Sequence, residues 1–234
     1  FGLGHLRRCR TIAHALVEDY RGLNVLIISG ATIAGAFDYR ARVDFVKIPS
    51  VIKLRNGEYT SMDQHIDLQE TLKMRQSIIR HTAETFQPDI FIVDKEPMGL
   101  RGEVEETLAY LKEKGTKLVI GLRDVMDEPA SLGDEWQRKM VFPALEQLYH
   151  QIWVYGLPQI CDPLEGVALP TKVRSFRACW APCPDGISTT ISGGSGRSAC
   201  PPASGRSPLW LVRPDAPPAA AHRRWRRTPS PGSR

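Results

Sequence analysis

Residues 1–16, FGLGHLRRCRTIAHAL, join a glycine-containing turn to a helical pattern without a break. Gly2 and Gly4 flank one leucine, and His5 and a pair of arginines follow. Apolar residues then recur at three- and four-residue steps, which predicts a helix with one buried face from about Gly4 to Tyr20. Glycine turns of this kind usually connect a buried strand to a helix. We therefore expect a fragment whose first strand, ahead of Phe1, has been removed.

Short apolar runs alternate with helical patterns through the rest of residues 1–177. The runs predict strands at 24–30, 43–50, 89–97, 117–124 and 151–156, with 172–176 beginning another. Helices are expected from Asp67 to Phe86, over 102–115 and within 129–149. Because the strands are apolar on both sides, this alternation predicts an α/β fold, a Rossmann-like doubly wound parallel sheet covered by helices.

Charged residues gather where the predicted strands end. His5 and Arg8 follow the opening turn, whereas the strands at 89–97 and 117–124 end in charged clusters. In doubly wound sheets, ligands bind at the carboxyl ends of the strands. We therefore expect three clusters to converge on one edge of the sheet: His5 with Arg8; Asp94, Lys95 and Glu96; and Arg123 with Asp124.

The opening turn has the features of an anion site. Gly2 and Gly4 allow the backbone to approach a ligand, and the N-terminus of the following helix favours a phosphate. His5 beside it could accept a proton from a hydroxyl as a general base. The alternative, equally compatible with the pattern, is that Gly4 permits close packing and His5 caps the helix. A dinucleotide fingerprint is not present, since Arg7 replaces its third glycine and the strand at 24–30 has no acidic end.

Residues 178–234 differ sharply in composition from the first part of the chain. They hold eight arginines against two aspartates, a net charge of +6, whereas residues 1–177 carry −1. They contain ten of the 18 prolines and no Lys, Glu, Asn, Gln, Phe, Tyr or Met. We interpret 1–177 as a folded domain and 178–234 as a disordered low-complexity tail. Because tryptophan and cysteine are unusual in functional tails, an out-of-frame product is favoured over a nucleic-acid-binding segment.

Composition also limits the class of protein. No apolar run approaches the 18 residues or so of a membrane-spanning helix, and no secretory signal is visible. The five cysteines lack the paired spacing of metal sites and are scattered, which indicates a reducing, cytoplasmic setting. We expect no metal and no cofactor.

Six ordered segments carry a family resemblance: GLGHLRRCRTIAHAL, VLIISG, VDFVKIPSVIKL, FIVDKEPMGLRGE, VIGLRDVMDEP and IWVYG. Over residues 1 to about 176 the chain resembles bacterial glycosyltransferases of the GT-B fold, which are distantly similar to the N-acetylglucosaminyltransferase of peptidoglycan synthesis. Such enzymes pair an N-terminal acceptor-binding domain with a C-terminal domain that binds the nucleotide sugar. The resemblance implies that this chain is the acceptor-side half, with the tail in place of the donor domain.

The resemblance also implies roles for individual residues. His5 would be the catalytic base, Gly2 and Gly4 would shape the donor-phosphate loop, and Arg8 would neutralise phosphate or brace that loop. The acceptor side would be lined by Asp94, Lys95, Glu96, Arg123 and Asp124.

The implied partners are a nucleotide-sugar donor and a sugar or lipid-linked acceptor, with peripheral membrane contact allowed and no nucleic acid. The fragment alone is expected to be inactive. A nucleotide-sugar hydrolase or epimerase of the same fold is an alternative, and a non-catalytic protein with a nucleic-acid-binding tail is another.

Overall fold

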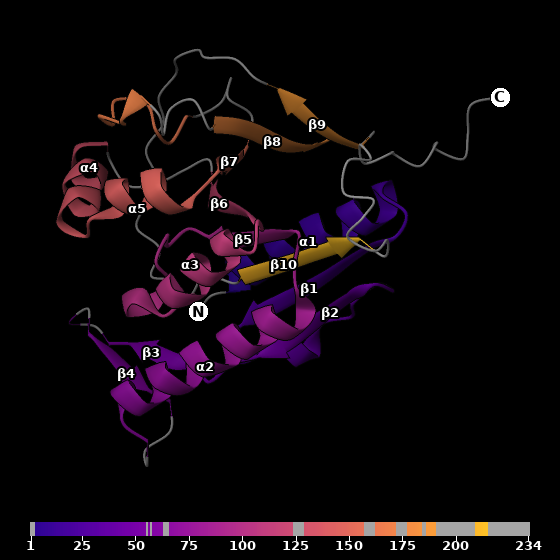
Figure 1. The fold of residues 1–234 in the computed structure, drawn as a ribbon, viewed down its shortest axis with the longest axis horizontal. Helices are drawn as coiled ribbons and strands as arrows, with labels where there is room; N and C mark the ends of the chain where they lie inside the picture. The colour runs from indigo at the N-terminus through magenta and orange to yellow at the C-terminus, as the bar shows by residue number, and fades with distance from the viewer. Residues whose placement is uncertain are drawn as a thin grey trace.

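The chain forms an α/β structure around one mixed, mostly parallel sheet (Figure 1). The computed structural model describes residues 3–54, 56, 58–62, 66–123, 129–156, 162–171, 177–183, 186–190 and 209–214. Within these residues, eight strands make up the sheet. In spatial order they are β2 (Val43–Lys47), β1 (Leu23–Ser29), β10 (Leu209–Pro214), β5 (Ile90–Asp94), β6 (Lys117–Arg123), β7 (Gln151–Tyr155), β8 (Arg177–Cys183) and β9 (Gly186–Thr190).

Six of these strands share one direction. β1 pairs parallel with β2, and β5, β6, β7 and β8 pair parallel in succession. β1 and β5 point the same way because both pair antiparallel with β10, which lies between them. β9 adds an antiparallel strand at one edge. The prediction of an α/β fold with a mostly parallel sheet is thus confirmed, and the arrangement is compatible with a Rossmann-like fold.

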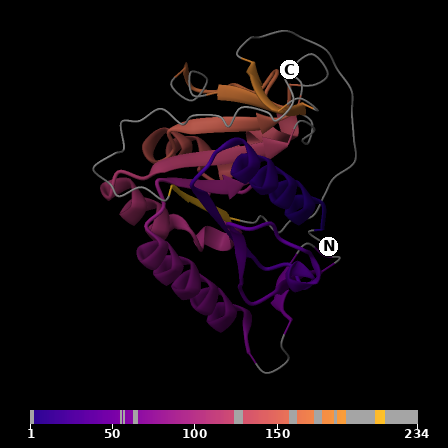
Figure 2. The same ribbon diagram turned by 90° about the vertical axis from the view of Figure 1, so that its right-hand side faces the viewer.

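Helices cover both faces of the sheet (Figures 1 and 2). α1 packs on one face, where Leu6 and Cys9 meet Ile92 of β5. The other helices pack on the opposite face, where Phe91 and Val93 lie in the core. Since neighbouring residues of β5 face different layers, both sides of the strand are buried, which explains its continuous apolar run. The helices are α1 (Leu3–Asp19), α2 (Leu68–Phe86), α3 (Glu105–Glu113), α4 (Pro129–Arg138) and α5 (Val141–Leu148).

β10 lies between β1 and β5 in the sheet. In the doubly wound strand order 3-2-1-4-5-6, strand 1 lies between strands 2 and 4 and leads into the first helix. Here β10 fills that place, running antiparallel to its neighbours β1 and β5. β8, β9 and β10 come wholly or largely from the segment interpreted above as a disordered tail. For the residues of 178–234 outside these strands, disorder stays a prediction.

The expected helices and strands of residues 1–156 correspond closely to the observed ones. α2 begins after Asp67, whose carboxylate accepts a hydrogen bond of 2.7 Å from the Glu70 backbone N–H. The helix expected within 129–149 is two helices, α4 and α5, separated at Met140, whose φ is +53°. A short hairpin of β3 (Val51–Lys53) and β4 (Tyr59–Ser61) was not predicted. The expected strand at 172–176 lies outside the described residues.

The helices of the described residues are either too short or too polar to cross a membrane.

The integration of β10 is tested by Leu211→Ala. Leu211 is 0% exposed and lies in the core on the α2 face, so its truncation is expected to cost about 2–5 kcal/mol of unfolding free energy. Leu54→Ala makes the same change at a residue that is 43% exposed and is the matched control. Urea denaturation compares the unfolding free energies of the two variants. An equally small loss in both would mean that β10 contributes nothing to stability and that residues 178–234 are independent of the sheet.

Candidate functional site

The start of α1 lies against the end of β5. Asp94, the last residue of β5, is completely buried and faces the layer that contains α1. His5 Nδ1 lies 2.7 Å from Asp94 Oδ2, and Arg8 Nη2 lies 3.0 and 3.2 Å from the two carboxylate oxygens. The structure therefore brings together three of the residues selected from the sequence, although His5 and Asp94 are 89 positions apart.

The geometry defines which atom of His5 can take part in chemistry. A ring nitrogen that faces a carboxylate oxygen at hydrogen-bond distance donates its hydrogen to that oxygen. His5 Nδ1 is thus the donor, and Nε2 keeps its lone pair. Nε2 has no hydrogen-bond partner among the described residues. An aspartate-oriented histidine of this kind can accept a proton from a bound hydroxyl.

Arg8 is held from a second side by Tyr155, at the end of β7. Its guanidinium carbon lies 5.3 Å from the centre of the Tyr155 ring. Tyr155 in turn lies across Gly121 of β6, where a Cβ atom would come within 2.0 Å of the tyrosine hydroxyl oxygen. Any side chain at Gly121 would therefore displace Tyr155.

The buried setting shifts the ionisation of both side chains. Burial is the largest single effect and lowers the pKa of Arg8, but the charge and hydrogen bond of Asp94, together with Cys9 and Tyr155, raise the pKa above its ordinary value. Burial raises the pKa of Tyr155 well above its ordinary value, and Asp94 raises it further. Arg8 is therefore a permanent cation and Tyr155 a neutral phenol.

The other predicted site residues have different positions. Arg123 ends β6, is partly buried, and pairs in register with Tyr155. Lys95 and Glu96 follow Asp94 but line a pocket that contains none of His5, Arg8 and Asp94. Gly2 and Asp124 lie outside the described residues.

Gly4 is exposed, and a Cβ atom built on it would meet no described atom within 4 Å. The described residues therefore give no support to the alternative that Gly4 allows tight strand–helix contact. His5, the next residue, is buried, with 7% of its surface exposed.

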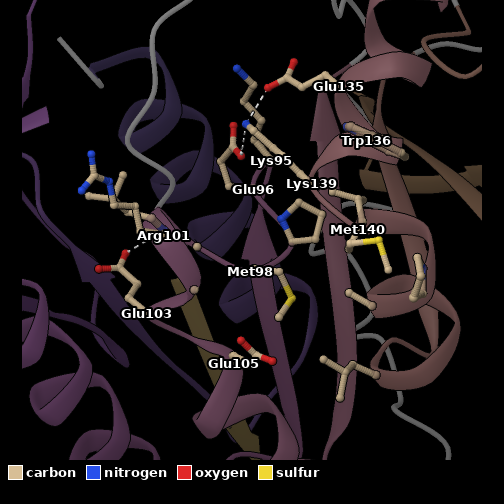
Figure 3. Close-up of a pocket in the computed structure, with 18 of the residues that line it drawn as sticks. Lys95, Glu96, Met98, Arg101, Glu103, Glu105, Glu135, Trp136, Lys139 and Met140 are labelled. Atoms are coloured by element: carbon tan, nitrogen blue, oxygen red, sulfur yellow. Dashed lines mark hydrogen bonds and ion pairs between the residues drawn. The ribbon is translucent and has the colours of Figure 1, made fainter. Parts of the chain in front are cut away.

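The pocket has a volume of about 1010 Å³ and lies among β3, the loop after β5 and helices α4 and α5 (Figure 3). Methionine, proline and tryptophan side chains make much of its wall, including Met98, Met140 and Trp136. One group of charged side chains lies at its upper end in Figure 3, where Lys139 pairs with Glu135 at 2.5 Å and approaches Glu96 at 3.7 Å. Arg101, Glu103 and Glu105 lie at its left and lower parts, so apolar and charged side chains share the lining. A cavity of this volume is large enough for a small molecule.

The wall of the pocket is fixed by a loop that only particular residues can form. Gly99 has φ +66°, and a Cβ atom there would lie 2.9 Å from Cγ of Glu103. The Tyr149 hydroxyl donates a hydrogen bond to the Pro97 carbonyl, and burial raises the pKa of Tyr149 well above its ordinary value. The loop after β5 is consequently tied to the end of α5.

A buried ion pair braces the same edge of the sheet. Arg75 Nε and Nη2 donate to the two carboxylate oxygens of Glu103 at 2.5 and 2.6 Å. Arg75 Nη1 also donates to the Pro49 carbonyl at 2.7 Å, and a Cβ atom on Gly30 would lie 2.7 Å from that nitrogen. Arg75 thus joins the loops that follow β1, β2 and β5.

Sequence reasoning missed Arg75, Glu103, Tyr155 and Gly121. A signal for Arg75 was present, because it lies in a helical stripe of residues that are otherwise small or apolar, Thr71, Ile79 and Ala83. A buried arginine in such a stripe requires a carboxylate partner. Tyr155 could have been selected from the sequence by the same rule as the other site residues, because it is the last residue of a strand.

Comparisons with protein-family models, with curated proteins and with solved structures find no match to this chain.

Glu103→Gln tests the brace. The change leaves a buried guanidinium without its countercharge, so we expect the unfolding free energy to fall by about 3 kcal/mol. Glu84→Gln is the matched control, because Glu84 pairs with Arg80 of the same helix at the surface, where ion pairs contribute under about 1 kcal/mol. Denaturation curves of equal midpoint for the two variants would contradict this account.

Proposed function

We propose that residues 1–177 are the acceptor-side domain of a GT-B-type glycosyltransferase, with His5 as its general base. The observation that supports this most is the hydrogen bond between His5 and buried Asp94 at the carboxyl end of β5, which leaves Nε2 unpartnered among the described residues. The resemblance of the GLGHLRRC segment to these enzymes supplies the reaction class. Both arguments point to the same residue.

In the proposed reaction, an acceptor hydroxyl attacks the anomeric carbon of a nucleotide sugar. The bond between that carbon and the diphosphate oxygen breaks, and the nucleotide diphosphate leaves with the electron pair. His5 Nε2 takes the hydroxyl proton, while the Asp94 carboxylate stabilises the resulting imidazolium through Nδ1. The diphosphate would bind at the start of α1, beside Gly4, where a built Cβ atom meets no described atom within 4 Å.

The pocket beside Lys95 and Glu96 is the proposed acceptor site. Its first lining residue after β5 is Lys95, next to Asp94, and it offers paired acidic and basic groups beside apolar side chains. It would hold the part of the acceptor remote from the reacting hydroxyl. In the proposed reaction, the nucleotide-sugar donor would be bound by the C-terminal domain that the resemblance implies.

The test is made in a protein that carries this loop together with a donor domain. His5→Ala is expected to lower turnover about 10²–10⁴-fold while donor binding changes little, because backbone N–H groups make the phosphate contacts. His5→Asn keeps a polar side chain without the basicity and should be nearly as impaired. His14→Asn, on the same helix but outside the cluster, should leave turnover unchanged.

Near-normal turnover in His5→Asn would refute the role of His5 as a base. An incubation with the nucleotide sugar alone distinguishes a transferase from a nucleotide-sugar hydrolase of the same fold. Release of free sugar from a nucleotide sugar without acceptor, dependent on His5, would identify a hydrolase instead.

A further inference from the structure

We propose that Arg8 is a positioning residue, which holds the Asp94 carboxylate through both oxygens and thereby keeps His5 in the tautomer with hydrogen on Nδ1. The inference rests on the proposed function only for its catalytic meaning, since the tautomer is a property of the chain itself. It assigns Arg8 to the histidine and aspartate rather than to a bound phosphate.

The Asp94 carboxylate requires a positively charged partner inside the protein. Asp94 has no contact with solvent, and a carboxylate in such surroundings is stable only when it is paired and hydrogen-bonded. Arg8 Nη2 is the one cationic group within hydrogen-bond distance of both oxygens among the described residues. With Arg8 in place, the carboxylate plane is fixed and Oδ2 points at His5 Nδ1.

The opposite tautomer of His5, in which Nδ1 accepts a hydrogen bond, is unfavourable beside Asp94. Arg8 Nη2 also lies 3.0 Å from His5 Nδ1, so the distances alone would permit Nδ1 to accept from Arg8. That arrangement would place the Nδ1 lone pair 2.7 Å from a carboxylate oxygen, away from water, which is electrostatically unfavourable. Because the Arg8 guanidinium keeps all of its hydrogens, it cannot give up a proton to relieve the repulsion between the Nδ1 lone pair and the carboxylate oxygen. Nδ1 must therefore donate to Asp94, and Arg8 donates to the carboxylate.

The Arg8 guanidinium is itself held in place by its surroundings. Its guanidinium lies against the Tyr155 ring, which fits across β6 because residue 121 is glycine. Arg8 is thus engaged by Asp94 and Tyr155 at once, which is typical of a residue that orients another group.

The test reads the tautomer of His5 directly. Long-range ¹H–¹⁵N spectra of ¹⁵N-histidine-labelled chain are recorded at about pH 8.5, two units above the ordinary pKa of histidine, and His5→Gln identifies the signal. We expect His5 to carry its hydrogen on Nδ1. His150 is an internal reference of the opposite kind, because its Nδ1 accepts a hydrogen bond from the Leu118 backbone N–H at 3.0 Å.

Arg8→Gln is expected to convert the His5 signal largely to the form with hydrogen on Nε2, because a buried carboxyl group that has lost its countercharge is favoured in its protonated form, which donates its hydrogen to Nδ1. Arg8→Lys should rescue the Nδ1–H form, because an ammonium can also donate to both carboxylate oxygens. Arg7→Gln makes the same change at an exposed neighbour on α1 and should alter nothing. If Arg8→Gln does not fold, Arg8→Met, which removes the charge and keeps an unbranched apolar side chain, should give the same loss of the Nδ1–H form.

Two results would overturn the proposal. One is a wild-type spectrum in which His5 carries its hydrogen on Nε2, and the other is a folded Arg8→Gln or Arg8→Met variant that keeps the Nδ1–H form. A protein without transferase activity, but with the expected spectra, would refute the proposed function and leave the role of Arg8 intact.

Discussion

The buried carboxylate of Asp94 is the constraint from which the architecture of the site follows. A carboxylate with no exposure must be compensated within the protein. Both compensating groups come from the beginning of α1, where His5 and Arg8 are three residues apart and therefore lie on one side of the helix. The charge on β5 thus ties the first turn of α1 to the sheet, next to the apolar cluster that contains Leu6 and Cys9.

The opposite face of the sheet has its own buried charge. Arg75 of α2 pairs with Glu103 near the same edge and reaches the Pro49 carbonyl. Each face is therefore braced by one buried ion pair, and the segment between Asp94 and Glu103 is held at both ends. That segment forms a wall of the pocket, so the position of the pocket relative to His5 depends on both pairs.

Much of this fold could be predicted from the sequence, because helices and strands with two buried faces leave clear apolar periods. His5, Arg8 and Asp94 could be selected because the carboxyl ends of parallel strands meet at one edge. The pairing of Nδ1 with Oδ2 could not, since it depends on side-chain directions across 89 residues. Whether these residues act on a sugar acceptor stays a proposal.

Other features lay beyond sequence reasoning for identifiable reasons. β3 and β4 are three residues each, too short to show a period. The break at Met140 is a single left-handed residue without glycine. β10 pairs through backbone hydrogen bonds with strands more than a hundred residues away, and its direction follows from no local pattern.

A double-mutant cycle on Arg8 and Asp94 tests the central claim most directly. The variants Arg8→Met, Asp94→Asn and their combination are compared with wild type by urea denaturation. The account predicts a coupling free energy of about 2–3 kcal/mol, near the upper end for residues in contact. The reason is that each single substitution leaves the other group buried without its charged partner. Additive effects, with coupling below about 0.5 kcal/mol, would show that the charge of Asp94 does not hold α1 to the sheet.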